Sequence, residues 1–299
     1  RRTVRVVETP PAPPALRPVT APSPPLRSMA RALVHRPGRP GSDTTVPSHG
    51  VELTSWPASS DQLAEYREVV GSSATLPLGF PAVVATRLLR DLMGLGRRPV
   101  SGLGLVHVAS QLWMSGRLPV DRPWQVRAWA DGVRHTRSGL ELDLWADARA
   151  QAGDERWTLR MVVLARSRDA RGPQRSARPW VEAGGPWDSE APLVVPVDAG
   201  WAYARVSGDY NPIHLNLLTA RPFGYPRPIA HGWWTLPRTL AVLGLDETPL
   251  EGERQLEVTY RSPVHMPSSP TAAARTDDRG TTVALLRDDG AVHLAAVLR

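Results

Sequence analysis

Two short stretches of the chain hold a dense set of polar side chains that could do chemistry. Residues 208–214 read GDYNPIH and residues 230–234 read AHGWW. In the simplest interpretation, Asp209 and the neighbouring asparagine cap a turn before the proline, and His214 is solvated. A second interpretation is a metal site formed by Asp209, His214 and His231. The chain has no HxH or HxxxH pair and no cysteine, which argues against a metal.

A third interpretation is an acid–base site, which needs a carboxylate and an imidazole close together and donors for a developing oxyanion. Asp209 and His214 supply the pair, Pro212 stiffens the loop between them, and Asn211 can bond the loop or a substrate oxygen. Gly232 precedes an apolar stretch that predicts a helix. Its N–H therefore lies near a helix N-terminus and can face a ligand oxygen. Taken alone, this stretch does not decide between a capped turn and an acid–base site.

The long stretch around both motifs resembles a known family. YARVSGDYNPIHLNLLTARPFGYPRPIAHG, residues 203–232, resembles the hydratase motif of the MaoC-like (hydratase-2) enzymes, which have the hot-dog fold. LPLGFP (76–81) and GLVHVASQL (104–112) resemble the other lobe of double-hot-dog 3-hydroxyacyl-thioester dehydratases. The resemblance covers roughly residues 50–299. It implies two fused hot-dog domains, each an antiparallel sheet wrapped around a central helix, paired as an internal pseudo-dimer with the acyl chain between them.

The resemblance also implies a role for each matching residue. Asp209 and His214 become the catalytic pair, Asn211 orders the loop, and the Gly232 N–H polarises the thioester carbonyl. His231 resembles a family position, and we expect it to orient the loop rather than transfer a proton. The implied reaction is the reversible, (R)-specific hydration of a trans-2-enoyl thioester or dehydration of a (3R)-hydroxyacyl thioester. It requires no metal and no redox cofactor.

Three further residues are expected to shape the acyl pocket: Tyr203, Trp233 and His107. Trp233 stands where the relatives more usually have methionine, so its bulk affects the acyl length that the pocket accepts. For His107 we favour a strand or core histidine bonded to the backbone over a catalytic one.

Composition restricts the class of protein. The 299 residues are 41% hydrophobic and 22% charged, and no stretch approaches the roughly 18 to 20 apolar residues of a membrane span. With no cysteine, a reducing cytoplasm is the simplest setting. The net charge is +7, but residues 1–50 carry eight Arg against two acidic residues, so +6 of it lies there. The remainder has no basic excess for nucleic acid.

Charge and proline content also suggest the domain boundaries. Residues 1–48 are rich in Pro and Arg and are expected to be a disordered tail, within which Met29 could be the natural start. Residues 167–192, rich in Pro, Gly and charge, read as a loose interdomain linker. We therefore expect a first lobe at 49–166 without catalytic motif and a catalytic lobe at 193–299.

The two lobes repeat each other in sequence. EYREVVGS (65–72) parallels AYARVSGD (202–209), and QLWMSGRLP (111–119) parallels QLEVTYRSP (255–263). Each copy predicts a short strand, a short helix, an irregular loop, a longer apolar helix and several strands, which is an α+β arrangement. The first copy has Gly71-Ser72 where the second has Gly208-Asp209, and no carboxylate or imidazole follows. One active site is therefore expected, in the second lobe.

The longer apolar helices are predicted at 81–93 and at about 233–244. Pro237 lies only five residues after Gly232, and a proline inside a helix costs about 3 kcal/mol. We therefore predict that the chain enters the second helix through an irregular turn at 232–236.

Two alternative functions compete with the hydro-lyase. One is a non-catalytic hot-dog subunit that binds acyl thioesters, and the other is a hot-dog thioesterase. Retention of Asp209, Asn211 and His214 argues against the first. The expected partner is an acyl thioester of CoA or of acyl carrier protein, with no nucleic acid and no membrane, and with a possible homodimer. The sequence does not distinguish the two carriers or the acyl length.

Overall fold

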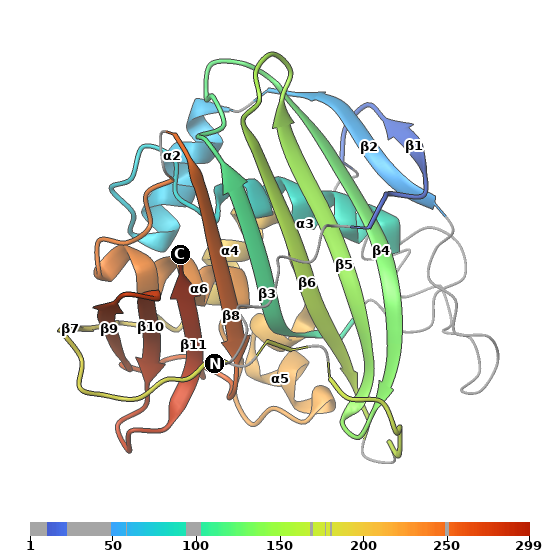
Figure 1. Ribbon diagram of the computed structural model, residues 1–299. Coiled ribbons are helices and arrows are strands. Elements are labelled where there is room, and N and C mark those ends of the chain that lie inside the picture. The colour runs from blue at the N-terminus through green and yellow to red at the C-terminus, as the bar shows by residue number, and fades with distance from the viewer. Residues whose placement is uncertain are drawn as a thin grey trace.

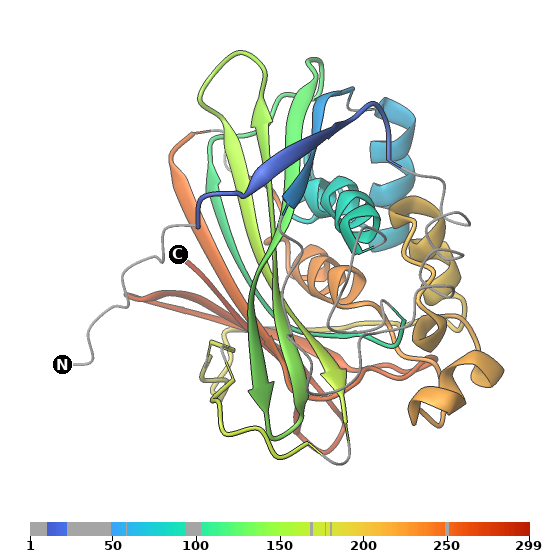
Figure 2. The same cartoon turned by 90° about the vertical axis from the view of Figure 1, so that its right-hand side faces the viewer.

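A computed structural model describes residues 11–22, 49–57, 59–93, 103–167, 170–176, 178–179, 181–248 and 251–299. Their strands form one continuous sheet with the order β1-β2-β4-β5-β6-β3-β8-β11-β10-β9-β7. The sheet curves around the helices, all of which lie on its concave side (Figures 1 and 2). No helix of the described residues is long and apolar enough to cross a bilayer.

The described residues of the first lobe form five strands and two helices. They are β2 (His49–Trp56), α2 (Ser60–Val70), α3 (Phe80–Met93), β3 (Val106–Ser115), β4 (Trp124–Thr136), β5 (Gly139–Ala150) and β6 (Arg156–Arg166). The predicted helix at 81–93 is thus confirmed as α3. It is buried along most of its length and packs against β4, β5 and β2.

The second lobe repeats this order. Its elements are β7 (Ser189–Pro192), α4 (Ala199–Ser207), η1 (Pro212–His214), α5 (Leu217–Ala220), η2 (Arg221–Phe223), α6 (Gly232–Val242), β8 (Glu253–Tyr260), β9 (Thr271–Asp277), β10 (Gly280–Leu286) and β11 (Val292–Leu298). Counted along the chain within each lobe, the strands take the same spatial order, 1-3-4-5-2. The predicted α+β double hot-dog architecture and the internal duplication are confirmed.

The two lobes join at the antiparallel pair β3 and β8. Leu112 lies directly opposite Leu256, and these residues are each other's counterparts in the sequence repeat. A pseudo-two-fold axis therefore passes between them. The short helices obey the same relation, because α2 ends at Gly71 (φ 63°) and α4 ends at Gly208 (φ 74°), both in the left-handed region that glycine tolerates.

The predicted irregular turn before Pro237 is wrong. α6 runs unbroken from Gly232 to Val242 with Pro237 inside it. The helix forms from its first residue because the N–H groups of Trp234 and Thr235 both donate to the His231 carbonyl, at 3.1 and 2.8 Å. Pro237 therefore removes a single backbone donor from the helix, and the residue is buried.

The prediction that residues 1–48 form a disordered tail is wrong for part of the tail. Ala15–Val19 form β1, which pairs in parallel with β2 at the end of the sheet. Backbone hydrogen bonding to an open strand edge needs no apolar periodicity, and Pro18 is tolerated because an edge strand has an unpaired side. Residues 1–10 and 23–48, Met29 included, lie outside the described residues.

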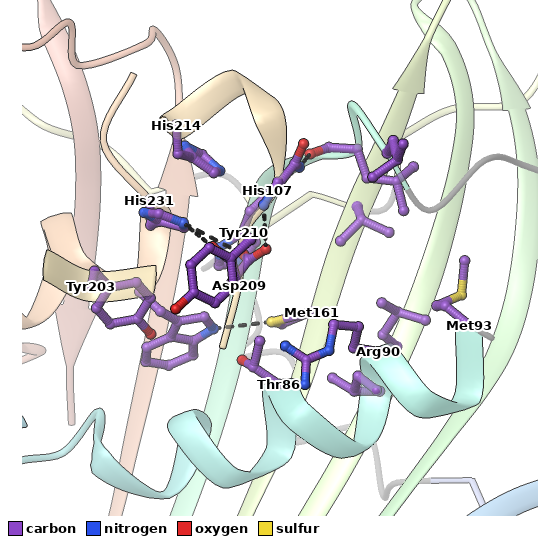
Figure 3. A pocket seen from close by; sticks show the side chains of 18 residues that line it. Thr86, Arg90, Met93, His107, Met161, Tyr203, Asp209, Tyr210, His214 and His231 are labelled. Carbon is purple, nitrogen blue, oxygen red and sulfur yellow. Dashed lines mark hydrogen bonds and ion pairs between the residues drawn. The ribbon is translucent and has the colours of Figure 1, made fainter. Parts of the chain in front are cut away.

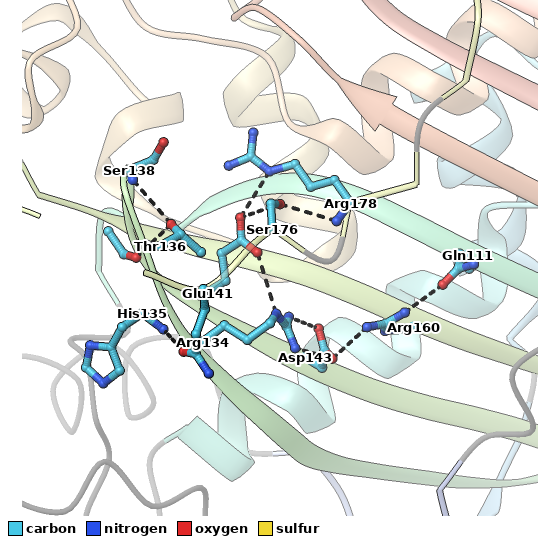
Figure 4. Close-up of polar contacts among 12 residues, drawn as sticks. Gln111, Arg134, His135, Thr136, Ser138, Glu141, Asp143, Arg160, Ser176 and Arg178 are labelled. Atoms are coloured by element: carbon cyan, nitrogen blue, oxygen red, sulfur yellow. Dashed lines mark hydrogen bonds and ion pairs between the residues drawn. The ribbon is translucent and has the colours of Figure 1, made fainter. Parts of the chain in front are cut away.

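The described part of the linker is attached to the outer face of the sheet rather than loose, which corrects that expectation. Ser176 and Arg178 bond the buried carboxylate of Glu141, at 2.7 and 3.2 Å (Figure 4). Further along, Arg261 donates to the Val181 carbonyl. The last four linker residues form β7, which pairs with β9.

A polar network continues from there across the strands (Figure 4). Arg134 and Arg160 both bond Asp143 at 2.8 Å, and Arg160 also donates to Gln111 at 2.9 Å. Gln111 in turn donates to Glu257 of β8, 3.1 Å away. The network therefore ties both lobes together on the face opposite the helices.

Candidate active site

The loop that follows α4 presents Asp209. The helix ends at Gly208, and the next N–H, that of Asp209, donates to Ser207 Oγ at 3.1 Å. The N–H of Asn211 then donates to Asp209 Oδ1 at 3.2 Å, which closes an Asx turn. One carboxylate oxygen thereby serves the loop, and the other stays available. About a third of the Asp209 side chain is exposed.

Asn211 ties this loop to the first lobe. Its Nδ2 donates to the Leu105 carbonyl at 3.0 Å, and its Oδ1 accepts from the Gly104 N–H at 3.1 Å. Both amide atoms are thus bonded to backbone just before β3.

His214 is buried and held in one tautomer. Its Nδ1 lies 2.7 Å from the Ile229 carbonyl, which can only accept, so Nδ1 carries the proton. Nε2 is then the basic nitrogen. Burial, reinforced by the neighbouring His231, holds the pKa of His214 well below 6.5. At neutral pH the ring is therefore an uncharged base.

His231 stacks on His214, with ring centroids 3.7 Å apart and 28° between the planes. Its Nε2 donates to the Asp209 carbonyl at 2.9 Å and lies 3.9 Å from Asp209 Oδ2. Burial lowers its pKa, while the Asp209 charge acts in the opposite direction. The ring of Tyr203 also packs against the His231 ring, with centroids 4.9 Å apart. His231 therefore connects the backbone of the Asp209 loop to the start of α6.

The three groups converge on one small volume (Figure 3). A carboxylate oxygen of Asp209, a ring nitrogen of His214 and a ring nitrogen of His231 all lie within 4.8 Å of one another. Two hydrogen bonds of about 2.8 Å span at most about 5.6 Å, so one water or hydroxyl can bond Asp209 and His214 together.

The same atoms are of the types that bind a cation. One N–H of each imidazole is already donated to a backbone carbonyl. Because the rings are stacked 3.7 Å apart, their in-plane lone pairs lie in two planes only 28° from parallel. This geometry suits a hydrogen-bonding acid–base pair better than a chelate.

Gly232 begins α6 beside this pair. The first N–H groups of a helix have no intrahelical acceptor and carry the positive end of the dipole. A Cβ here would come 3.0 Å from Tyr260 Cζ and closer still to His107 Nδ1, so only glycine fits. The Tyr260 hydroxyl donates to the Gly232 carbonyl at 2.9 Å. The His231 carbonyl, in the same peptide unit as the Gly232 N–H, accepts from the N–H groups of Trp234 and Thr235, so the Gly232 N–H is held at the start of α6.

A cavity of about 150 Å³ between the lobes receives all of these groups. Every residue singled out from the sequence lines it: His107, Tyr203, Asp209, Asn211, His214, His231, Gly232 and Trp233. The remainder of the wall is mostly apolar and comes from the first lobe: Leu89, Met93, Leu103, Leu105, Leu144, Met161 and Val163. We refer to this space as the inner cavity.

A larger groove of about 980 Å³ lies on the other side of the site. His107, His214 and Gly232 line both spaces, so the inner cavity and this groove meet at these residues. Arg166, Arg178 and Arg261 line this outer groove.

His107 is a half-buried residue of β3, and its Nε2 bonds the Ala109 carbonyl at 3.0 Å, the backbone contact favoured from the sequence, and Ser110 Oγ at 2.6 Å. Burial lowers its pKa to about 4, so it is neutral at physiological pH. Its ring packs on Tyr260 and Trp233, with centroids 4.6 and 6.1 Å apart. Trp233 itself is fixed by donating its indole N–H to Met161 Sδ at 3.0 Å.

Sequence reasoning missed Arg90 and Tyr210, which also line the inner cavity. Tyr210 carried no signal beyond its place between Asp209 and Asn211. For Arg90 a signal existed, because an arginine amid the apolar residues of α3 must find a polar partner.

Comparison with known proteins finds similarity to proteins described as dehydratases. Residues 181–276 match the family model described as "MaoC like domain". The chain is 27% identical over 277 residues to 3-hydroxyacyl-thioester dehydratase X of Mycobacterium tuberculosis, covering 92% of this chain and 96% of the relative. A crystal structure of HtdX from the same organism aligns with TM-score 0.71 and 25% identity over 84% of this chain and 99% of that one.

A further M. tuberculosis structure, described as a double hotdog fold, aligns with TM-score 0.51 and 14% identity, covering 86% of this chain and 96% of that one. At that identity it supports the fold alone. The resemblance to the MaoC-like double-hot-dog dehydratases is confirmed.

Proposed function

We propose that this MaoC-like double-hot-dog chain is a hydro-lyase that hydrates trans-2-enoyl thioesters and dehydrates (3R)-hydroxyacyl thioesters. The observation that carries the proposal is the meeting of Asp209 and His214 within 4.8 Å at the head of the inner cavity, beside the Gly232 N–H. The similarity to a protein named as a 3-hydroxyacyl-thioester dehydratase supports the reaction class.

In hydration, Asp209 and the basic Nε2 of His214 hold one water. His214 takes a proton from that water as the water oxygen bonds to C3 of the substrate. Electrons of the double bond move to the thioester oxygen, and the Gly232 N–H stabilises the resulting enolate-like charge. The imidazolium then gives its proton to C2, which restores the base. The product has gained one H at C2 and one OH at C3, and dehydration is the reverse.

Because one imidazole handles both protons, H and OH add to the same face of the double bond. Asp209 accepts a hydrogen bond from the other O–H of the water. The position of Asp209 thereby determines which face of the double bond is attacked. The (R) configuration follows in this proposal from the side of the substrate on which the Asp209–His214 pair lies.

The two spaces on either side of the site suit the two ends of a thioester. The acyl chain would occupy the apolar inner cavity, with its carbonyl at Gly232, and the carrier arm would leave through the outer groove. Three arginines along that groove match the phosphate of a phosphopantetheine arm, whether on CoA or on a carrier protein. We also propose that residues 49–166 and 193–299 are the two lobes, joined by 167–192.

The test is an assay of the hydration of crotonyl-CoA and longer enoyl-CoA esters. The decrease in enoyl absorbance measures the rate. Asp209→Asn and His214→Ala should each lose about 10²- to 10⁴-fold in kcat, the contribution expected of a general acid–base group. Circular dichroism shows whether the variants fold. Turnover unchanged in both variants would remove the assignment.

The same assay separates the alternatives. Release of free CoA without loss of the enoyl group would indicate a thioesterase, and substrate binding without turnover a non-catalytic subunit. Chiral analysis of the 3-hydroxyacyl product tests the stereochemistry: a (3S) product contradicts the proposed face of attack.

A further inference from the structure

The helix that delivers Asp209 is capped by arginines of the other lobe. The last carbonyl groups of a helix have no intrahelical donor. At the end of α4, Arg87 donates to the Val206 carbonyl at 2.7 Å, and Arg90 donates to the Gly208 carbonyl. Both arginines lie on α3, three residues apart and therefore on one helix face. The carbonyl that Arg90 binds belongs to the residue immediately before Asp209.

These two bonds place positive charge inside the protein. Both guanidinium groups are half-buried, and burial lowers the pKa of each. Attraction to Asp209 acts in the opposite direction on Arg90. Arginine stays protonated even so, so Arg90 brings a fixed cation close to the reactive carboxylate. In Figure 3, Arg90 extends from α3 into the inner cavity.

The pseudo-symmetric position in the other lobe has a matching arrangement. At the end of α2, Trp234 donates to the Val69 carbonyl at 2.9 Å, and Arg238 donates to the Val70 carbonyl at 3.3 Å. Both donors lie on α6. Each central helix thus caps the short helix of the opposite lobe.

Only one of the two capped helices leads to a reactive group. After α2 the chain continues with Gly71 and Ser72, whose hydroxyl is bonded to Asp246. After α4 it continues with Gly208 and Asp209. The other lobe therefore provides an internal control, because a central helix also caps its short helix, through Trp234 and Arg238, and Ser72 rather than a carboxylate follows the cap.

We propose that Arg90 and Arg87 are positioning residues for the hydro-lyase reaction: by capping α4 from the first lobe, they hold Asp209 at bonding distance from the water shared with His214. This rests on the function proposed above. It gives the first lobe a part in the chemistry although that lobe contributes no acid or base.

The experiment compares Arg87→Met, Arg90→Met and the matched control Arg238→Met in the full-length chain. Arg87 does not line the inner cavity, so Arg87→Met isolates the cap from any contact with the acyl chain. We expect kcat for crotonyl-CoA hydration to fall about tenfold or more in both α3 variants, since a small displacement of a catalytic group is costly. In Arg87→Met, KM should stay within about threefold, and Arg238→Met should keep kcat within about twofold.

Amide hydrogen exchange supplies a readout that does not depend on activity. Exchange over residues 207–214 should accelerate in Arg87→Met and Arg90→Met, whereas Arg238→Met should accelerate exchange over 70–76 only. Arg90→Lys retains a charged donor and should recover part of the lost kcat; it also serves if Arg90→Met does not fold.

An unchanged kcat in both α3 variants, or an equal loss of kcat in Arg238→Met, would overturn the proposal. The outcome is separable from that of the proposed function. If the wild type hydrates no enoyl thioester, the proposed function fails, and the exchange comparison alone decides whether the arginines anchor the loop. Unchanged exchange over 207–214 then refutes the anchoring as well.

Discussion

Replacing Gly232 by alanine tests the oxyanion donor with a single methyl group. An ideal Cβ at this position lies 3.0 Å from Tyr260 Cζ and 3.2 Å from His107 Cγ, and nearer still to His107 Nδ1. Carbon atoms pack at about 3.5 Å or more. The start of α6 or the two rings must therefore move apart by at least about half an ångström.

The rings have little freedom to move. Tyr260 is tied by its hydroxyl to the Gly232 carbonyl, and His107 by its Nε2 to Ala109 and Ser110. We therefore expect the Gly232 peptide to shift, with a stability loss of about 1 to 3 kcal/mol for overpacking. Complete loss of an oxyanion donor lowers kcat by about 10²- to 10³-fold. A partly displaced donor should therefore lower kcat by about tenfold to a hundredfold.

Enoyl-CoA hydration gives kcat, and thermal unfolding gives the stability loss. The double variant Gly232→Ala/His107→Ala relieves the tightest contact and should regain part of the lost kcat, although His107→Ala alone also removes packing. If Gly232→Ala keeps kcat within twofold of wild type, the Gly232 N–H is not the oxyanion donor.

Three further changes have expected outcomes. Because burial keeps the folded-state pKa of His107 at about 4, below the 6.5 of the unfolded chain, the unfolded state takes up the proton first as the pH falls. Protonation of His107 in the unfolded chain should lower the free energy of unfolding by about 2 to 3 kcal/mol between pH 7 and pH 4.5. Urea titrations should show that His107→Phe lacks this contribution to the pH dependence. Gly208→Ala forces a side chain to φ 74° and brings its Cβ 2.5 Å from Arg90 Nη1, so it should lose about 1 to 2 kcal/mol, a cost that equal melting temperatures would contradict. Trp233→Met should raise the rate for longer enoyl-CoA esters relative to crotonyl-CoA, and an unchanged chain-length profile would show that Trp233 does not limit the inner cavity.

Much of the fold was predictable because local patterns carry it. The 3.6-residue apolar spacing of residues 81–93 and the alternation in 255–260 and 292–298 correspond to α3, β8 and β11. The internal repeat then fixed the arrangement, since two copies of one unit adopt one topology. The pairing of Leu112 with Leu256 is the structural form of that repeat.

The candidate site was predictable where its residues are close in sequence. Asp209, Asn211 and His214 lie within six residues, so a single loop brings them together. His107 depends on the pairing of the lobes, and its place beside Gly232 could be expected only through the family resemblance.

Other features depend on contacts that sequence patterns do not encode. The Arg90 bond to the Gly208 carbonyl joins residues 118 apart in sequence, across two lobes. β1 forms by backbone pairing, which any sequence can make. The unbroken α6 shows tertiary packing outweighing the intrinsic cost of Pro237.

The pseudo-two-fold axis between β3 and β8 has a consequence for how such a site can change. In a symmetric dimer of identical chains, every substitution appears twice, so a change that enlarges the acyl wall in one subunit also changes the equivalent position in the subunit that supplies the acid and base. In this protein the two lobes related by the axis are separate segments of one chain, so a substitution in one lobe is not repeated in the other. The wall made by Leu89, Leu144 and Val163 can vary while the loop of Asp209 stays fixed, so substrate range and chemistry can diverge independently within one chain.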